Sequence, residues 1–140
     1  MVNLAPAHLA RRMIKEKAGT HKLLIWVPSF VWALVVLFLS VMPCNDLPKL
    51  TIKHFDKVIH FVEYLIFALL VMKGLDTHRE GISGKQALLF TLIIAGLYGI
   101  LMELFQLFVP GREPSLGDWV ADLGGAVAGM TIGRMKICRK

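Results

Sequence analysis

The sequence predicts an all-α polytopic membrane protein, a bundle of four transmembrane helices with both termini in the cytoplasm. The 140 residues are 56% hydrophobic and only 19% charged, with a mean hydropathy of +0.62. Ordinary soluble domains carry about 25% charged residues. The apolar residues fall into four runs, and most lysines and arginines lie outside these runs, in the tails and connections. Because one bilayer span needs roughly 20 residues, four spans leave about 60 for tails and loops. This composition excludes a large soluble enzyme, a disordered chain and a disulfide-stabilised scaffold.

The first 22 residues are predicted to form a basic cytoplasmic tail, and residues 23–43 the first span. No charged residue occurs from Leu23 to Asn45, which is long enough to cross a bilayer. A cleaved signal peptide would instead have an apolar core of about 7–15 residues, followed by small residues. The run here is longer and ends in the bulky pair Met42 and Pro43, so we expect an uncleaved helix.

Three further spans are predicted, at residues 54–72, 87–109 and 118–135, and together with the first they form the membrane domain 23–135. The first half of the second span carries charged residues, and the third is interrupted near its end by Glu103 and Gln106. The fourth begins with acidic residues and continues through small ones. Pro43 ends the first span, and Pro48, Pro110 and Pro114 fall between spans, where the missing backbone donor breaks no helical hydrogen bond.

The orientation follows from the lysines and arginines of the short loops, which are enriched on the cytoplasmic side. The tail 1–22, the loop 73–86 and the C-terminus, including the basic segment 136–140, carry five, three and four of them, twelve in total. The opposite side carries the other four of the 16. Both termini are therefore predicted to be cytoplasmic, with Cys44 outside and Cys138 inside, so that these two cannot pair.

The net charge of +6 is thus mainly an orientation signal. No basic stripe is interleaved with aromatic residues, as binding to nucleic acid would require. We expect membrane lipids as partners and no nucleic acid.

Polar and ionisable side chains within the spans gather, in this topology, in the outer half of the membrane. They come from the last three spans and from the connection before the fourth: Asp56, Lys57, His60, Glu63, Tyr64, Glu103, Gln106, Arg112, Ser115, Asp118 and Asp122. An ionised side chain at membrane depth costs at least about 2.5–3.5 kcal/mol. We therefore expect Glu63, Glu103 and Asp122 to face the interior of the bundle and to pair with bases or share protons.

Helical spacing supports one shared polar surface. Asp56, His60 and Glu63 lie at positions i, i+4 and i+7, on one face of one helix. Asp118 and Asp122 are likewise separated by one turn. With His60 neutral, five acids against two bases give this layer a formal charge of −3. Such a site suits a divalent cation, shared protons or a cationic ligand group better than bare phosphate. No compact ligand motif such as HExxH is present, so the identity of any cofactor or metal stays open.

The first functional hypothesis is a membrane-embedded enzyme or acceptor site for a lipid-linked envelope molecule at the outer leaflet. His60 would act as general acid and base, oriented by Glu103 or Asp122. Arg112 and Lys57 would clamp anionic groups. The remaining ligand-binding candidates are Asp56, Tyr64, Gln106, Ser115 and Asp118.

Two other hypotheses remain open. In one, the polar layer belongs to a non-enzymatic bundle that binds a ligand, relays protons or organises envelope proteins. In the other, the layer only specifies how the helices pack. Gly125, Gly129 and Gly133 form a small-xxx-small stripe, which lets another helix approach closely and also offers a surface for an oligomer contact.

The polar residues resemble, in their order, the VanZ-like family of small bacterial integral membrane proteins. The matching pattern is Asp56-Lys57-x-x-His60-x-x-x-Tyr64, then Glu103-x-x-Gln106, then Arg112-x-x-Ser115-x-x-Asp118-x-x-x-Asp122-x-x-Gly125-x-x-x-Gly129. It covers about residues 35–133. The resemblance implies a multi-pass protein of the bacterial cytoplasmic membrane that acts on the cell envelope and is associated with tolerance of the glycopeptide teicoplanin. The position of Asp122 is often asparagine in that family.

Overall fold

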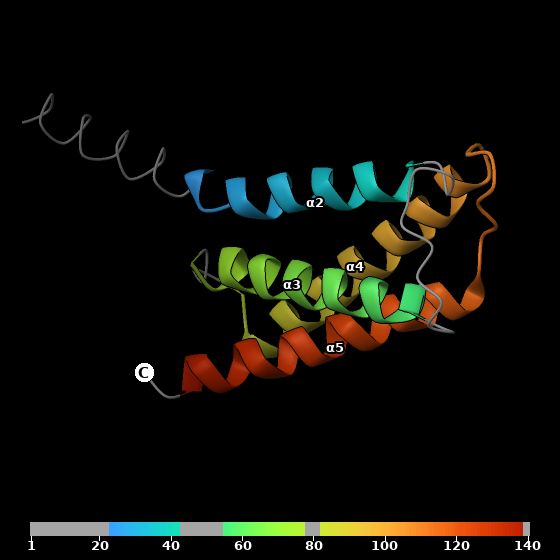
Figure 1. Cartoon of the computed structure of the whole chain (residues 1–140). Coiled ribbons are helices and arrows are strands. Elements are labelled where there is room, and N and C mark those ends of the chain that lie inside the picture. The colour runs from blue at the N-terminus through green and yellow to red at the C-terminus, as the bar shows by residue number, and fades with distance from the viewer. Residues whose placement is uncertain (1–22, 43–54, 78–81, 139–140) are drawn as a thin grey trace, which may run out of the picture.

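The computed structural model describes residues 23–42, 55–77 and 82–138, and this part of the chain is all-α, without strands. Its helices are α2 (Val27–Ser40), α3 (Phe55–Thr77), α4 (Gly84–Gln106) and α5 (Leu116–Cys138). Successive helices run in opposite directions, so the start of α2 and the end of α5 lie at one end of the bundle (Figure 1). The connection 107–115 lies at the other end. The predicted all-α fold is therefore confirmed, whereas the predicted tail 1–22 lies outside the described residues.

Two helices are long and apolar enough to cross a membrane. Stretches of α3 and α4 reach a mean hydropathy of 1.9 and 2.2, respectively. α2 is apolar but has only 14 residues, and α5 is interrupted by acidic residues and glycines. The described residues thus form four helices, as predicted, and two of these helices are long and apolar enough to span a membrane.

The observed boundaries of α4 differ from the predicted span 87–109 because of local capping. Ser83 and Gln86 form a capping box, in which the Ser83 hydroxyl accepts from the Gln86 N–H and the Gln86 side chain accepts from the Ser83 N–H. These bonds satisfy backbone donors of the first turn, so α4 begins at Gly84. The helix ends at Gln106, four residues before the proline at position 110.

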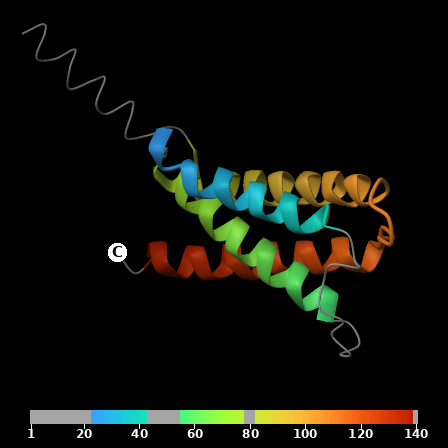
Figure 2. The ribbon, with the colours of Figure 1, turned by 45° about the horizontal axis from the view of Figure 1, so that its top comes forward.

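α3 and α5 form the closest helix pair, and Figure 2 shows α3 crossing α5 obliquely. A Cβ atom at Gly125 would overlap the carbonyl oxygen of Phe61, and one at Gly129 would overlap that of Leu65. Only glycine lets the two backbones approach so closely. Within the folded chain α3 therefore covers the glycine stripe of α5, including Gly133. This stripe is the surface that the sequence analysis proposed for an oligomer contact.

α2 is attached to the rest of the bundle by side chains that bond main-chain carbonyls. The Tyr98 hydroxyl donates to the carbonyl of Ala33 at 2.5 Å, and Arg112 donates to the carbonyls of Leu39 and Met42 at 2.9 and 3.3 Å. The last carbonyls of a helix have no partner within the helix and carry partial negative charge. The Arg112 guanidinium therefore fixes the end of α2 next to the connection 107–115.

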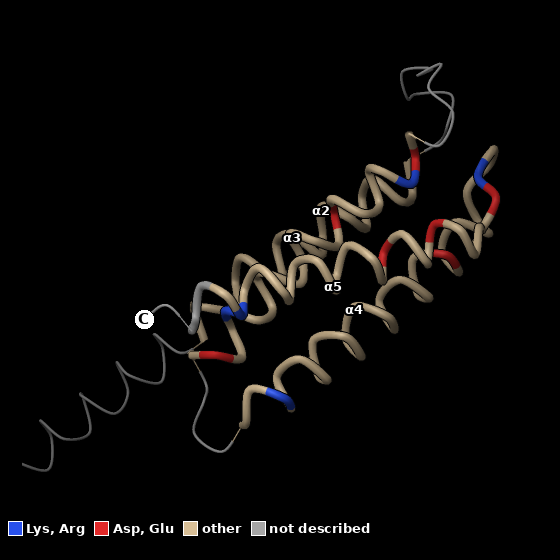
Figure 3. The backbone as a smooth tube through the Cα atoms, turned by 90° about the horizontal axis from the view of Figure 1, so that it is seen from below, with Lys and Arg blue, Asp and Glu red and all other residues tan. Residues whose placement is uncertain are grey.

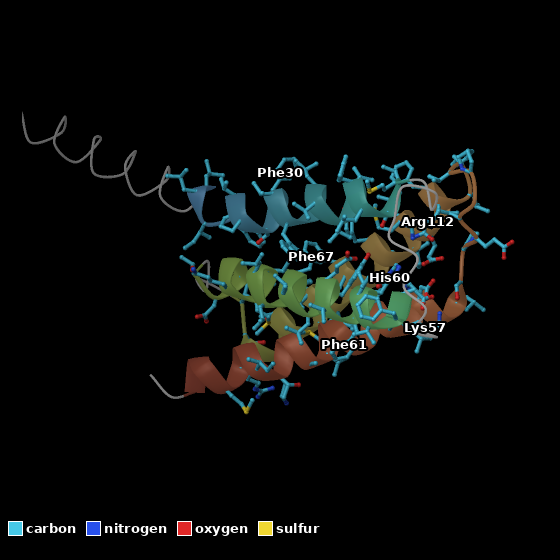
Figure 4. The ribbon with its side chains drawn as sticks, in the orientation of Figure 1. Phe30, Lys57, His60, Phe61, Phe67 and Arg112 are labelled. Carbon is cyan, nitrogen blue, oxygen red and sulfur yellow. The ribbon has the colours of Figure 1, made fainter. Side chains whose placement is uncertain are left out.

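The outer surface of the bundle is apolar. Phe30 on α2, Leu97 on α4 and Phe108 after α4 are all largely exposed, and Phe30 points away from the other helices in Figure 4. The interior instead holds Tyr64, whose ring contacts that of Phe67 edge to face. Large apolar side chains outside and polar ones inside are the arrangement expected of a bundle surrounded by lipid.

The substitution Gly125→Ala is expected to destabilise the protein. The added methyl would overlap the Phe61 carbonyl group, and such overpacking costs about 1–3 kcal/mol. Gly124→Ala is the matched control, because its Cβ would lie 3.6 Å from the Phe61 ring, an ordinary contact. Thermal unfolding in detergent, followed by circular dichroism, should show a lower Tm for Gly125→Ala alone. Equal Tm values for both variants would refute the close approach of α3 and α5.

Arg112→Gln is expected to loosen α2. Hydrogen bonds from a charged donor contribute about 1.5–3 kcal/mol, and glutamine cannot reproduce the two guanidinium contacts with α2. The neighbouring, exposed Glu113 provides the control variant Glu113→Gln. Hydrogen exchange measured by mass spectrometry should show faster exchange in residues 27–40 of Arg112→Gln than of Glu113→Gln. Unchanged exchange in this segment would contradict the anchoring role of Arg112.

Candidate functional site

The acidic residues of the described chain are concentrated near one end of the bundle. In Figure 3 most red positions lie toward the end that carries the connection 107–115, and one lies near the opposite end. This exception is Asp76, next to the last residue of α3. The other acidic residues of the described chain thus lie around one end of α3, α4 and α5.

Three of these polar residues meet in the interior. His60 of α3, Glu103 of α4 and Asp122 of α5 each offer one nitrogen or oxygen atom, and these atoms lie within 4.8 Å of one another. His60 Nδ1 and Asp122 Oδ1 are hydrogen-bonded at 3.0 Å. Only 7% of His60 and 1% of Asp122 is exposed. We call these three residues the HED cluster; they are the three that the sequence predicted as catalytic.

Two glycines position the HED cluster. Gly125 brings α5 against α3 at Phe61, directly after His60, so that Asp122 faces His60 across the helix contact. On α4, a Cβ at Gly99 would lie 3.0 Å from Asp122 Oδ2. Gly99 stands one turn before Glu103, and its missing side chain leaves space for the aspartate against α4.

Glu103 is held by the start of α5. Its Oε2 accepts a hydrogen bond from the backbone N–H of Ser115 at 2.6 Å. The Ser115 carbonyl in turn accepts from the N–H groups of Asp118 and Trp119 in the first turn of α5. This contact joins the end of α4 to the start of α5. The other carboxylate oxygen, Glu103 Oε1, has no hydrogen-bond partner among the described residues.

Several buried polar atoms near the HED cluster have no hydrogen-bond partner among the described residues. They are Asp122 Oδ2, Glu103 Oε1, the Tyr64 hydroxyl and Gln106 Nε2. Tyr64 is 1% exposed and Gln106 2%, and Tyr64 lies one turn after His60, within electrostatic range of Asp122 and Glu103. Unsatisfied groups are rare in folded interiors. Their gathering here is typical of a site that takes up an ion, water or a ligand.

Lys57 and Arg112, the lysine and arginine that the structure describes at this end, already have partners. Lys57 Nζ bonds Asp118 at 2.6 Å and Asp56 at 3.2 Å, and Arg112 bonds carbonyls of α2. Figure 4 shows Lys57, His60 and Arg112 at the same end of the bundle. Lys57 and Arg112, the predicted anion clamp, thus direct these donors at acids and at main-chain oxygens.

An apolar groove of about 410 Å³ lies between α4 and α5 beside the HED cluster. Its lining is formed by Ile100, Glu103, Leu104, Leu107, Pro114, Ser115, Leu116 and Trp119. Glu103 belongs to both the groove and the HED cluster. We call this cavity the lateral groove, because Leu104, Leu107 and Leu116 expose it on the apolar outer surface.

The sequence prediction missed two residues of this site. Trp119 is not among the predicted site residues, yet it lines the lateral groove and its indole N–H donates to the carbonyl of Gly96 at 3.1 Å. Gly99 was not singled out. Its only sequence signal is its place one turn before Glu103, on the same face of α4.

Comparison with known proteins gives one match. The model of the VanZ/LLP1 family matches residues 1–137, nearly the whole chain. No curated protein and no solved structure matches. Together with the apolar helices α3 and α4, the family match indicates a membrane protein. The chain belongs to the VanZ/LLP1 family.

Proposed function

We propose that the protein crosses the bacterial cytoplasmic membrane four times, with both termini inside and the HED cluster in the outer leaflet. The alternating directions of the helices support this topology, as does the excess of lysine and arginine on the side of the termini. His60 and Asp122 stand five and six residues inside the starts of α3 and α5. At 1.5 Å per residue, this corresponds to roughly 7–9 Å below the helix ends.

The proposed function is to bind a lipid-linked molecule of the cell envelope from the outer leaflet. The apolar tail would occupy the lateral groove, and the polar end would reach the HED cluster. One observation carries this proposal: Glu103 lines the apolar groove and also belongs to a buried cluster with unpartnered oxygens. A site that is mostly apolar with a few convergent polar groups is typical of ligand binding.

The chemistry of the cluster favours some ligand groups over others. His60 is held by Asp122 and is the side chain best suited to move a proton within the site. Two carboxylates stand beside it, while Lys57 and Arg112 are engaged elsewhere. The ligand atoms that meet the cluster are therefore hydroxyl or amino groups rather than bare phosphate oxygens.

The proposed topology predicts opposite accessibility for the two cysteines of the chain, Cys44 and Cys138. A membrane-impermeant maleimide should label Cys138→Ser, which retains Cys44, in intact spheroplasts. Cys44→Ser, which retains Cys138, should be labelled only after permeabilisation. Labelling is measured by the mass shift of the purified protein. The reverse pattern would invert the topology, and labelling of both variants in intact spheroplasts would exclude it.

Lipid binding is tested by filling the lateral groove. Leu104→Trp places an indole in the groove, whereas Leu97→Trp adds the same group two turns earlier on the exposed surface of α4. Protein in nanodiscs made from bacterial envelope lipids is purified, and the retained lipids are quantified by mass spectrometry. We expect at least tenfold less polyprenyl-linked lipid with Leu104→Trp than with Leu97→Trp, a difference of about 1.4 kcal/mol.

Equal retention by the two tryptophan variants would refute the groove as the lipid site. The same samples show whether the wild type alters the lipid, which separates an enzyme from a binding protein. In cells, Leu104→Trp should lower teicoplanin tolerance to the level of the strain without the protein, whereas Leu97→Trp should not.

A further inference from the structure

The HED cluster has the donor set and the shape of a metal site. Its nearest atoms are one imidazole nitrogen and two carboxylate oxygens, all within 4.8 Å of one another. Bonds from zinc to such donors measure about 2.0–2.2 Å, so donors on one ion lie at most about 4.4 Å apart. The 4.8 Å limit on the three donor atoms is close to this range. His60 Nδ1 and Asp122 Oδ1 already satisfy it at 3.0 Å.

A second, independent observation comes from the unpartnered atoms. Asp122 is 1% exposed, and its Oδ2 has no hydrogen-bond partner among the described residues. Glu103 Oε1 and the Tyr64 hydroxyl are also buried atoms without a hydrogen-bond partner among the described residues. Helix packing alone would leave these groups desolvated without compensation. A bound cation offers what the carboxylates lack, because an ionised carboxylate only accepts and cannot satisfy a second carboxylate.

The charge of the cluster points to a divalent ion. With His60 neutral and both acids ionised, the formal charge is −2 in a water-poor interior. The cations nearby do not balance it, because Lys57 is bonded to Asp56 and Asp118. A divalent ion would neutralise the cluster without any movement of the helices.

We propose that His60, Glu103 and Asp122 bind a divalent transition-metal ion, with Zn²⁺ or Mn²⁺ as the best fit. An imidazole ligand disfavours Ca²⁺ and Mg²⁺, which take oxygen ligands. Three protein ligands leave a position open, as in catalytic rather than structural sites. The Ser115 N–H, bonded to Glu103 Oε2 at 2.6 Å, acts as an outer partner that orients one ligand.

A ligand in the lateral groove would reach the ion at Glu103, because Glu103 belongs to both the groove and the HED cluster. The metal proposal rests on the three side chains and needs no lipid. Metal binding and lipid retention are therefore measured separately, and either proposal can fail while the other stands.

The test uses the full-length protein in detergent, stripped with EDTA and titrated with ZnCl₂ or MnCl₂ by isothermal calorimetry. We expect one ion per chain for the wild type. His60→Ala and Asp122→Asn should each weaken binding at least tenfold. Asp76→Asn is the matched control, because Asp76 is an aspartate near the opposite end of the bundle from the cluster. It should bind like the wild type.

Thermal unfolding keeps the result interpretable if a variant folds poorly. Added metal should raise the Tm of the wild type and of Asp76→Asn, and should leave that of Asp122→Asn unchanged. Asparagine has nearly the same size as aspartate, so Asp122→Asn should still fold. The Tm of this variant with metal is compared with its own Tm without metal. The proposal is overturned if the stripped wild type binds no stoichiometric ion, or if Asp76→Asn and Asp122→Asn weaken binding equally.

Discussion

The structure depends on the contact between the backbones of α3 and α5. Gly125 and Gly129 lie against the carbonyls of Phe61 and Leu65, where any side chain would overlap. In lipid, helices gain little from burying apolar surface against each other, so close van der Waals packing becomes a main source of association. The same contact sets His60 opposite Asp122. Fold stability and site geometry are thus coupled through two glycines.

Much of the fold could be predicted because membrane helices leave strong signals in hydropathy. The four apolar runs gave the number and order of the helices, and the i, i+4 spacing gave the shared face of Asp56 and His60. Helix boundaries were less predictable. The start of α4 depends on a capping box between Ser83 and Gln86, a local pattern that hydropathy does not register.

The centre of the site was also predictable, since an ionisable group within a span must face the interior. That reasoning selected His60, Glu103 and Asp122 correctly as neighbours. It could not assign partners to the cations. Arg112 donates to the carbonyls at the end of α2. A sequence does not show which main-chain carbonyl will accept such a bond, because every residue supplies one. The lateral groove was unpredictable for a similar reason, since it arises from the spacing of two helices.

The attachment of α2 has a consequence for how this chain can vary. Tyr98 and Arg112 lie outside α2, and the oxygens they contact are main-chain carbonyls, those of Ala33 and Leu39 in α2 and that of Met42 just after it. Such acceptors persist whatever side chains α2 carries, provided that it remains a helix. Part of what attaches α2 therefore lies in other parts of the chain, while the Trp32 indole N–H of α2 donates to the Glu63 carbonyl at 2.9 Å. The outward-facing side chains of α2 can therefore be exchanged during evolution with little effect on its attachment. Sequence identity between relatives should be lower in α2 than in the helices around it.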